Sequence, residues 1–144
     1  MRKSILHRQQ NLVYEVKGNG LPVMLVHGFA EDRCIWNELV PAVPAKYRWL
    51  IPDLPGSGES DFNKDLQSIA DFAEALNAIR QEEQIRQMVL IGHSMGGYIS
   101  LALAEKYPET LKGLGLFHST AYGDKPEKKE SRKKSVDFIR HHGP

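Results

Sequence analysis

A serine between two glycines constrains this sequence more than any other feature. The apolar run at residues 88–91 is typical of a buried parallel strand, and a nearly all-apolar helix is predicted over residues 98–107, where Pro108 ends it. The turn that joins them begins with Gly92, His93, Ser94, Met95 and Gly96. A strand, a glycine-flanked serine and a helix in immediate succession predict a sharp turn that exposes the serine hydroxyl at the carboxyl end of a sheet.

The glycines have a physical role in such a turn. Ser94 would adopt a strained backbone conformation, and Gly92 and Gly96 omit side chains that would collide where strand and helix cross. The helix N-terminus would place N–H groups and the positive end of its dipole beside the serine, where an oxyanion could form. The alternative interpretation makes Ser94 only a helix N-cap, but the surrounding pattern favours a nucleophile.

Short apolar runs alternate with helical patterns along the chain. Buried strands are predicted at residues 23–26, 47–51, 88–91 and 114–117, with a flanking antiparallel strand at 12–16. Further helices are predicted at residues 35–40, ended by Pro41, and at 69–79, capped by Ser68. This alternation predicts an α/β fold with a mostly parallel sheet and helices on both of its faces.

Composition narrows the classes of function. Lys and Arg total 19 against 18 Asp and Glu, so no field of one sign favours nucleic acid or an anionic membrane. The sequence shows no signal-peptide pattern and no transmembrane run, and its single cysteine excludes an intramolecular disulfide. We therefore expect a cytoplasmic protein that acts on a small molecule.

A second motif follows the strand predicted at 23–26. His27 and Gly28 lead to Phe29 in a loop that can offer the Phe29 backbone N–H to the same site. The N–H of Met95 would be a second donor, and two such donors form an oxyanion hole. The alternative is that His27 and Gly28 only end a strand.

A third motif occupies residues 53–60, directly after the strand predicted at 47–51. Asp61 stands where G-x-G-x-x-G would need its third glycine, and no helix begins there, so dinucleotide binding is disfavoured. The glycines are expected to form turns, with Asp53 hydrogen-bonded to the local backbone.

In this order, the three motifs resemble those of the α/β-hydrolase superfamily, above all its esterase, lipase and perhydrolase-like members. The resemblance covers residues 23–118. It implies a serine hydrolase that cleaves carboxylic esters through an acyl-enzyme on Ser94, with the Phe29 and Met95 amides as oxyanion donors. It implies an ester-like small-molecule substrate and neither a metal nor an organic cofactor.

The same resemblance suggests that the sheet is truncated before its last strands. Family members build about eight strands and often insert a helical cap after the strand that corresponds to residues 114–117. Residues 1–122 would be the N-terminal part of the core domain, and residues 123–144 a charged linker and the start of a cap. The acid and histidine of the triad would lie beyond this chain, which by itself is expected to be inactive or weakly active.

The histidines near the motifs have structural interpretations. His93 is expected to pack, and His27 to make a structural hydrogen bond. His118 ends a predicted strand at the same rim of the sheet, where lining the pocket is favoured over acting as the general base.

Two other function classes stay open. A hydrolase-fold fragment could bind a small molecule or a partner chain, because an unpaired last strand favours self-association or complementation by a C-terminal half. The same turn also serves acyl transfer, perhydrolysis and C–C bond hydrolysis.

Overall fold

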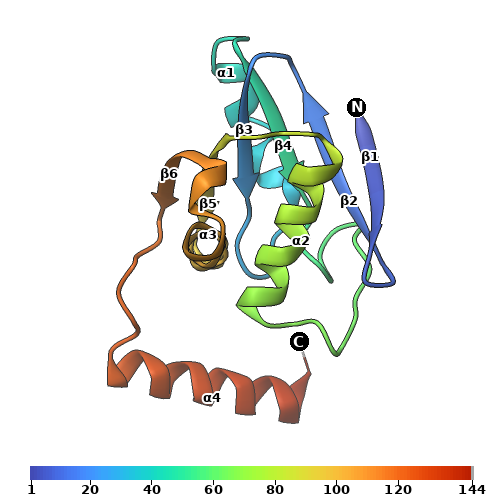
Figure 1. Ribbon diagram of the computed structural model, residues 1–144. Helices are drawn as coiled ribbons and strands as arrows, with labels where there is room; N and C mark the ends of the chain where they lie inside the picture. Colours follow the sequence, from blue (N-terminus) through green and yellow to red (C-terminus); the bar gives the residue numbers. More distant parts are fainter. Residues whose placement is uncertain (144) are drawn as a thin grey trace.

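The computed structural model describes residues 1–143, which form a six-stranded sheet with helices on both faces (Figure 1). Its strands are β1 (Arg2–His7), β2 (Gln10–Lys17), β3 (Leu21–Val26), β4 (Tyr47–Pro52), β5 (Met88–His93) and β6 (Leu111–Phe117). Its helices are η1 (Arg33–Trp36), α1 (Leu39–Ala42), α2 (Ile69–Glu82), α3 (Met95–Lys106), η2 (Pro108–Thr110) and α4 (Pro126–His142). The strand order is β1-β2-β4-β3-β5-β6, antiparallel through β1, β2 and β4 and parallel from β4 to β6. The predicted fold class is confirmed.

The central strand β3 divides the core between the two faces of the sheet. Successive side chains of a strand point to opposite faces. Met24 and Val26 accordingly pack with the apolar residues of α2 and α3, whereas Val23 and Leu25 pack around Trp36 of η1. Burial on both faces explains why β3 is a continuous apolar run in the sequence.

The prediction of a helix over residues 35–40 is wrong. The chain instead forms the short η1 and then α1, and Pro41 lies inside α1 rather than ending a helix before it. A proline fits the first turn of a helix because the N–H groups there have no intrahelical partner. Trp36 is buried but Ile35 and Leu39 are 41% and 44% exposed, so the apolar residues do not share one buried face.

The strand β1 was not predicted. It forms a hairpin with β2 whose turn residues Arg8 and Gln9 have φ values of 47° and 63°. Two consecutive positive φ values are typical of a two-residue hairpin turn, for which Asn-Gly is the usual sequence signal. Arg8-Gln9 lacks that signal, so the turn could not be recognised.

The helix α2 begins as predicted. The Ser68 side chain accepts a hydrogen bond from the Asp71 amide, and the Asp71 carboxylate accepts one from the Ser68 amide. This reciprocal capping box satisfies two N–H groups at the start of the helix and fixes where α2 begins.

The charged region after residue 123 consists largely of the helix α4. The helix α4 has no buried residue, and it lies beyond the end of the sheet toward which β3 points (Figure 1). Its apolar side chains Val136, Phe138 and Ile139 are exposed. Within residues 1–143, no helix combines the length and the apolar character needed to cross a membrane.

A buried acidic residue joins the N-terminal hairpin to α2. Glu83 accepts hydrogen bonds from Lys3 Nζ at 2.8 Å and from Tyr14 Oη at 2.6 Å, and it pairs with Arg48. Burial by itself would raise the pKa of Glu83, but the hydrogen bonds from Lys3 and Tyr14 hold this pKa below its ordinary value. The carboxylate is therefore charged at neutral pH and ties β1, β2 and β4 to α2.

Replacing this carboxylate tests its role. Glu83→Gln should lower the free energy of unfolding by roughly 2–3 kcal/mol at neutral pH, because Lys3 and Arg48 lose a charged partner. A lowered folded pKa means that the contribution is present above the ordinary value of 4.5 and is lost as pH falls through the folded value. Urea unfolding should therefore show the difference from wild type narrowing at acidic pH. An equal loss in the exposed control Glu82→Gln would contradict this account.

Candidate active site

The turn between β5 and α3 holds Ser94 in a conformation that few residues adopt. Ser94 has φ 51° and ψ −115°, is exposed, and makes no side-chain capping bond to α3. Its backbone is fixed by the end of β6 and the segment that follows it, because the Ser94 N–H donates to the Phe117 carbonyl at 3.0 Å and Ser119 Oγ donates to the Ser94 carbonyl at 2.8 Å. The hydroxyl is thus not used as an N-cap, whereas the strained backbone is held from two directions.

Gly92 and Gly96 allow this turn to form. A Cβ at Gly92 would lie 2.2 Å from the Gly96 carbonyl oxygen. A Cβ at Gly96 would lie 2.5 Å from the carbonyl oxygens of both Val26 and His27. The first turn of α3 therefore rests directly on the backbone at the ends of β5 and β3, which brings the loop after β3 beside Ser94.

His27 is a buried part of the scaffold of this loop. Its Nε2 accepts a hydrogen bond from the Leu54 amide at 2.9 Å, and its Nδ1 lies 2.8 Å from the Gly28 carbonyl oxygen. An amide only donates and a carbonyl only accepts, so the ring is neutral with its proton on Nδ1. Burial lowers the pKa of His27, which favours the same neutral form. Both ring nitrogens are occupied, and neither is free to act as a base.

The residues that follow His27 border an open pocket beside the turn. Phe29 and Met95 line a cavity of about 360 Å³ together with Ala30, Leu54, Pro55, Gly56, Ser57, Phe62, Gln67 and Phe72. Within residues 1–143, the backbone amides of Phe29 and Met95 donate no hydrogen bond to a protein group. The two amides expected to be oxyanion donors thus belong to residues that border the same cavity. Within the described residues, neither amide is engaged in a hydrogen bond.

The structure adds Glu31, which sequence reasoning missed. Its Oε2 accepts a hydrogen bond from the Gly28 amide at 2.6 Å and lies 2.9 Å from His93 Nδ1. The His93 ring also contacts the rings of Trp36 and Phe117. A carboxylate three residues after a loop glycine was the available signal, but its partner His93 is 62 positions away.

His118 follows β6 on the same rim. Its φ is 47° and its side chain is exposed, with its ring stacked edge-on against Phe117 at 4.6 Å and 6.1 Å from the ring of His93. His118 is not among the residues that line the cavity beside Phe29 and Met95.

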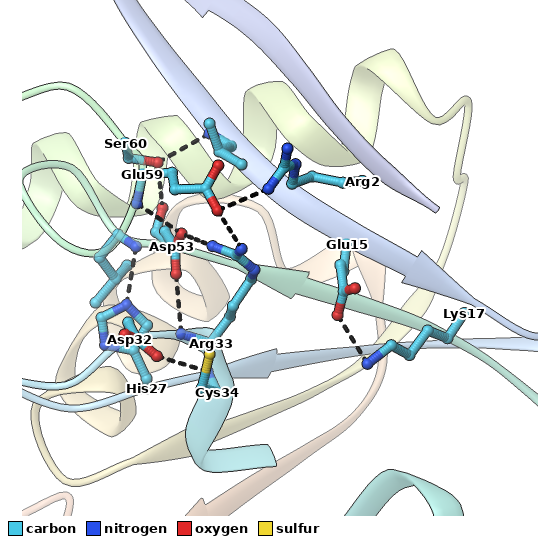
Figure 2. Close-up of polar contacts among 12 residues, drawn as sticks. Arg2, Glu15, Lys17, His27, Asp32, Arg33, Cys34, Asp53, Glu59 and Ser60 are labelled. Atoms are coloured by element: carbon cyan, nitrogen blue, oxygen red, sulfur yellow. Dashed lines mark hydrogen bonds and ion pairs between the residues drawn. The ribbon is translucent and has the colours of Figure 1, made fainter. Parts of the chain in front are cut away.

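A charged network fixes the turn after β4 (Figure 2). The buried Asp53 accepts hydrogen bonds from the amides of Arg33 and Glu59, each at 2.9 Å, and pairs with the Arg33 side chain. Arg33 also reaches Glu59 at 2.5 Å. Gly58, with φ 53°, leaves the space that the Asp53 carboxylate fills. The predicted local hydrogen bonds of Asp53 are present, but its partner Arg33 was not foreseen.

Residues 1–143 contain no cluster of three or more His, Cys, Asp or Glu side chains that could hold a metal ion. The polar groups around Ser94 are backbone amides, a hydroxyl and the Glu31–His93 pair. Such a set suits covalent chemistry at a carbonyl carbon.

Two glycine variants test the packing of the turn. Gly92→Ala should lower the free energy of unfolding by roughly 3 kcal/mol or more, because its methyl group would overlap the Gly96 backbone. Gly113→Ala is the control, since its Cβ would meet only the Val89 side chain at 3.9 Å. It should be neutral or stabilising by up to about 1 kcal/mol. Equal effects in denaturant unfolding would contradict the proposed contact.

Comparison with known proteins identifies the family. A family model for the alpha/beta hydrolase fold matches residues 22–128. A solved thermophilic esterase from Thermogutta terrifontis is 36% identical with a TM-score of 0.86, covering 100% of this chain and 55% of that chain.

Two curated relatives also match this chain in sequence. The chain is 36% identical over 112 residues to the dihydrolipoyllysine-residue acetyltransferase component of an acetoin cleaving system of Pseudomonas putida, covering 77% of this chain and 30% of the relative. It is 36% identical over 98 residues to a pimeloyl-(acyl-carrier protein) methyl ester esterase of Aeromonas hydrophila, covering 67% and 37%. The chain thus spans about a third of the length of these relatives. It belongs to the α/β-hydrolase fold family.

Proposed function

We propose that this chain carries the nucleophile and the oxyanion hole of a serine esterase. The observation that carries the proposal is the backbone of Ser94, held at φ 51° with its hydroxyl exposed and uncommitted. Strain of this kind persists only where the surroundings enforce it, and it is typical of a nucleophile at a strand-to-helix turn. The esterases among the relatives support an ester as substrate.

The proposed reaction proceeds in two halves. Ser94 Oγ attacks the ester carbonyl carbon and passes its proton to a general base. The carbonyl oxygen becomes an oxyanion that accepts hydrogen bonds from the Phe29 and Met95 amides. Collapse of this intermediate breaks the bond to the alcohol oxygen, which takes the proton from the base and leaves an acyl group on Ser94. Water then attacks the acyl-enzyme in the same way and releases the acid.

We propose that the general base and its acidic partner lie outside residues 1–144. Both nitrogens of His27 are occupied, and Nδ1 of His93 is paired with Glu31. The share of the relatives that the chain spans, 55% of the esterase from Thermogutta terrifontis, supports a further contribution. Oxyanion donors and binding alone retain roughly 10³–10⁴-fold acceleration over water in enzymes stripped of a triad. The chain by itself should therefore show weak activity.

The cavity beside Ser94 favours an apolar group on the substrate. Leu54, Pro55, Phe62 and Phe72 contribute apolar lining, and the cavity volume of about 360 Å³ is large enough for a short or medium hydrocarbon chain. Met95 links this cavity to the turn because it directly follows Ser94. We propose that the acyl group of the ester lies here.

The edge of β6 supports a second candidate function, the binding of another chain. Among residues 1–143, β6 pairs with β5 on one side only, and Leu114, Leu116 and Phe117 are 40%, 36% and 50% exposed. Unpaired strand edges recruit further strands. We propose that the occupant is the C-terminal part of a hydrolase domain, since the chain matches 55% of the Thermogutta terrifontis esterase. A second copy of this chain is the competing occupant.

Ester cleavage tests the role of Ser94. Wild-type chain mixed with a short-chain p-nitrophenyl ester should release p-nitrophenol only slowly, because Ser94 stays protonated and weakly nucleophilic without a base. Ser94→Ala should abolish this slow release, and His118→Ala should keep it. Rapid turnover lost in His118→Ala would place the base within this chain. Identical traces from wild type and Ser94→Ala would contradict an esterase and favour the binding role.

Methionine NMR tests the proposed acyl site. Met24 and Met88 are fully buried and Met1 is 79% exposed, so Met95 is the one methionine that lines the cavity. Titration with octanoate should shift the ¹³C-methyl signal of Met95 and leave the other three unchanged. Acetate is the control and should shift none of them. Octanoate binding that leaves the Met95 signal in place would exclude this cavity as the acyl site.

A further inference from the structure

Glu31 forms a bridge between the two segments that carry the candidate chemistry. One oxygen, Oε2, accepts a hydrogen bond from the Gly28 amide at 2.6 Å and is 2.9 Å from His93 Nδ1. Gly28 directly precedes Phe29 in the loop after β3, and His93 directly precedes Ser94 at the end of β5. The carboxylate therefore joins the residue before the proposed oxyanion donor to the residue before the proposed nucleophile.

The loop after β3 is in close contact with the turn of Ser94 at Gly28. A Cβ placed on Gly28 would lie 2.8 Å from Glu31 Oε2, 3.1 Å from Ser94 Cβ and 3.3 Å from His93 Nδ1. All three groups thus border the space that the missing side chain of Gly28 leaves. Glu31 thus lies between the loop and the turn that carry the candidate chemistry, but it does not line the cavity beside Phe29.

The charge state of Glu31 determines the direction of its hydrogen bond with His93, whereas the Gly28 amide can only donate. Burial by itself would raise the pKa of Glu31, but the hydrogen bonds that it accepts from His93 and from the Gly28 amide hold this pKa below its ordinary value. An ionised carboxylate only accepts, so His93 donates through its Nδ1–H. Hydrogen bonds to a charged acceptor are shorter and stronger than neutral ones, which suits a carboxylate that must hold a loop in place.

We propose that Glu31 is a positioning residue, which clamps the loop of Gly28 and Phe29 to the turn of His93 and Ser94 and thereby sets where the Phe29 amide points. This inference rests on the proposed function, in which the Phe29 amide donates to the oxyanion. Donors act only when they are aimed at the oxygen before the charge develops. Loss of the clamp should therefore lower kcat far more than it raises KM.

Three variants separate positioning from general stability. Glu31→Ala removes the clamp, and Glu31→Gln keeps one oxygen that can accept from Gly28. Asp32→Ala is the matched control, because Asp32 is the next carboxylate in the same loop, and its side chain caps η1 through the Cys34 amide. The control removes a charge and a hydrogen bond from the same loop without touching Gly28 or His93.

The first readout is the ¹H–¹⁵N spectrum of the full chain, which does not depend on activity. Glu31→Ala should move the Gly28 amide proton upfield, as a strong hydrogen bond is lost, and should shift the Phe29 amide as well. Glu31→Gln should restore part of both shifts, and Asp32→Ala should leave them in place. Unchanged Gly28 and Phe29 amides in Glu31→Ala, or equal shifts in Asp32→Ala, would overturn the proposal.

The second readout is the Ser94-dependent release of p-nitrophenol. Glu31→Ala should reduce kcat by about tenfold to a hundredfold at nearly constant KM, the range expected for one hydrogen bond to a charged group, whereas Asp32→Ala should keep kcat. A raised KM with unchanged kcat would overturn the positioning role. If wild type shows no Ser94-dependent release, the proposed function fails, and the amide shifts still decide whether Glu31 holds the loop.

Discussion

The close backbone contact between the first turn of α3 and the ends of β3 and β5 is the constraint on which the site depends. Gly92 and Gly96 leave no room for a side chain, and a Cβ of Gly96 would lie only 2.5 Å from the Val26 and His27 carbonyl oxygens. This contact brings the helix N-terminus, the loop after β3 and Ser94 together. A larger residue at either glycine would separate the nucleophile from the backbone amides that are proposed to assist it.

Buried charges in this fold are kept in place by partners from distant parts of the chain. Asp53 is paired with Arg33, and Glu83 is paired with Lys3 and Arg48. A buried charge is tolerated only when it is paired and hydrogen-bonded. These pairs also stabilise the arrangement of the elements, because they join the turn after β4 to η1 and the N-terminal hairpin to α2. The scaffold around the site is thereby fixed at several points outside the sheet.

The parts of the fold that were predictable are those with local signals. The strand before Ser94, the glycines of the turn and the cap at Ser68 each follow from neighbouring residues, and the mostly parallel sheet follows from the alternation of strands and helices. The prediction of a helix at residues 35–40 was wrong because the apolar residues there do not share one buried face: Trp36 is buried, whereas Ile35 and Leu39 are exposed. β1 was missed since its turn, Arg8-Gln9, is an unusual one. Glu31 and Arg33 were missed because their side-chain partners, His93 and Asp53, are distant in sequence. No local sequence pattern indicates such pairing.

Acylation of Ser94 tests the central claim most directly. The chain would be incubated with p-nitrophenyl acetate, and its intact mass and peptides would be compared with those of Ser94→Ala. The account predicts one acetyl group on the peptide that contains Ser94, present in wild type and missing in the variant. Acetyl groups spread equally over lysines in both proteins, with Ser94 unmodified, would contradict it.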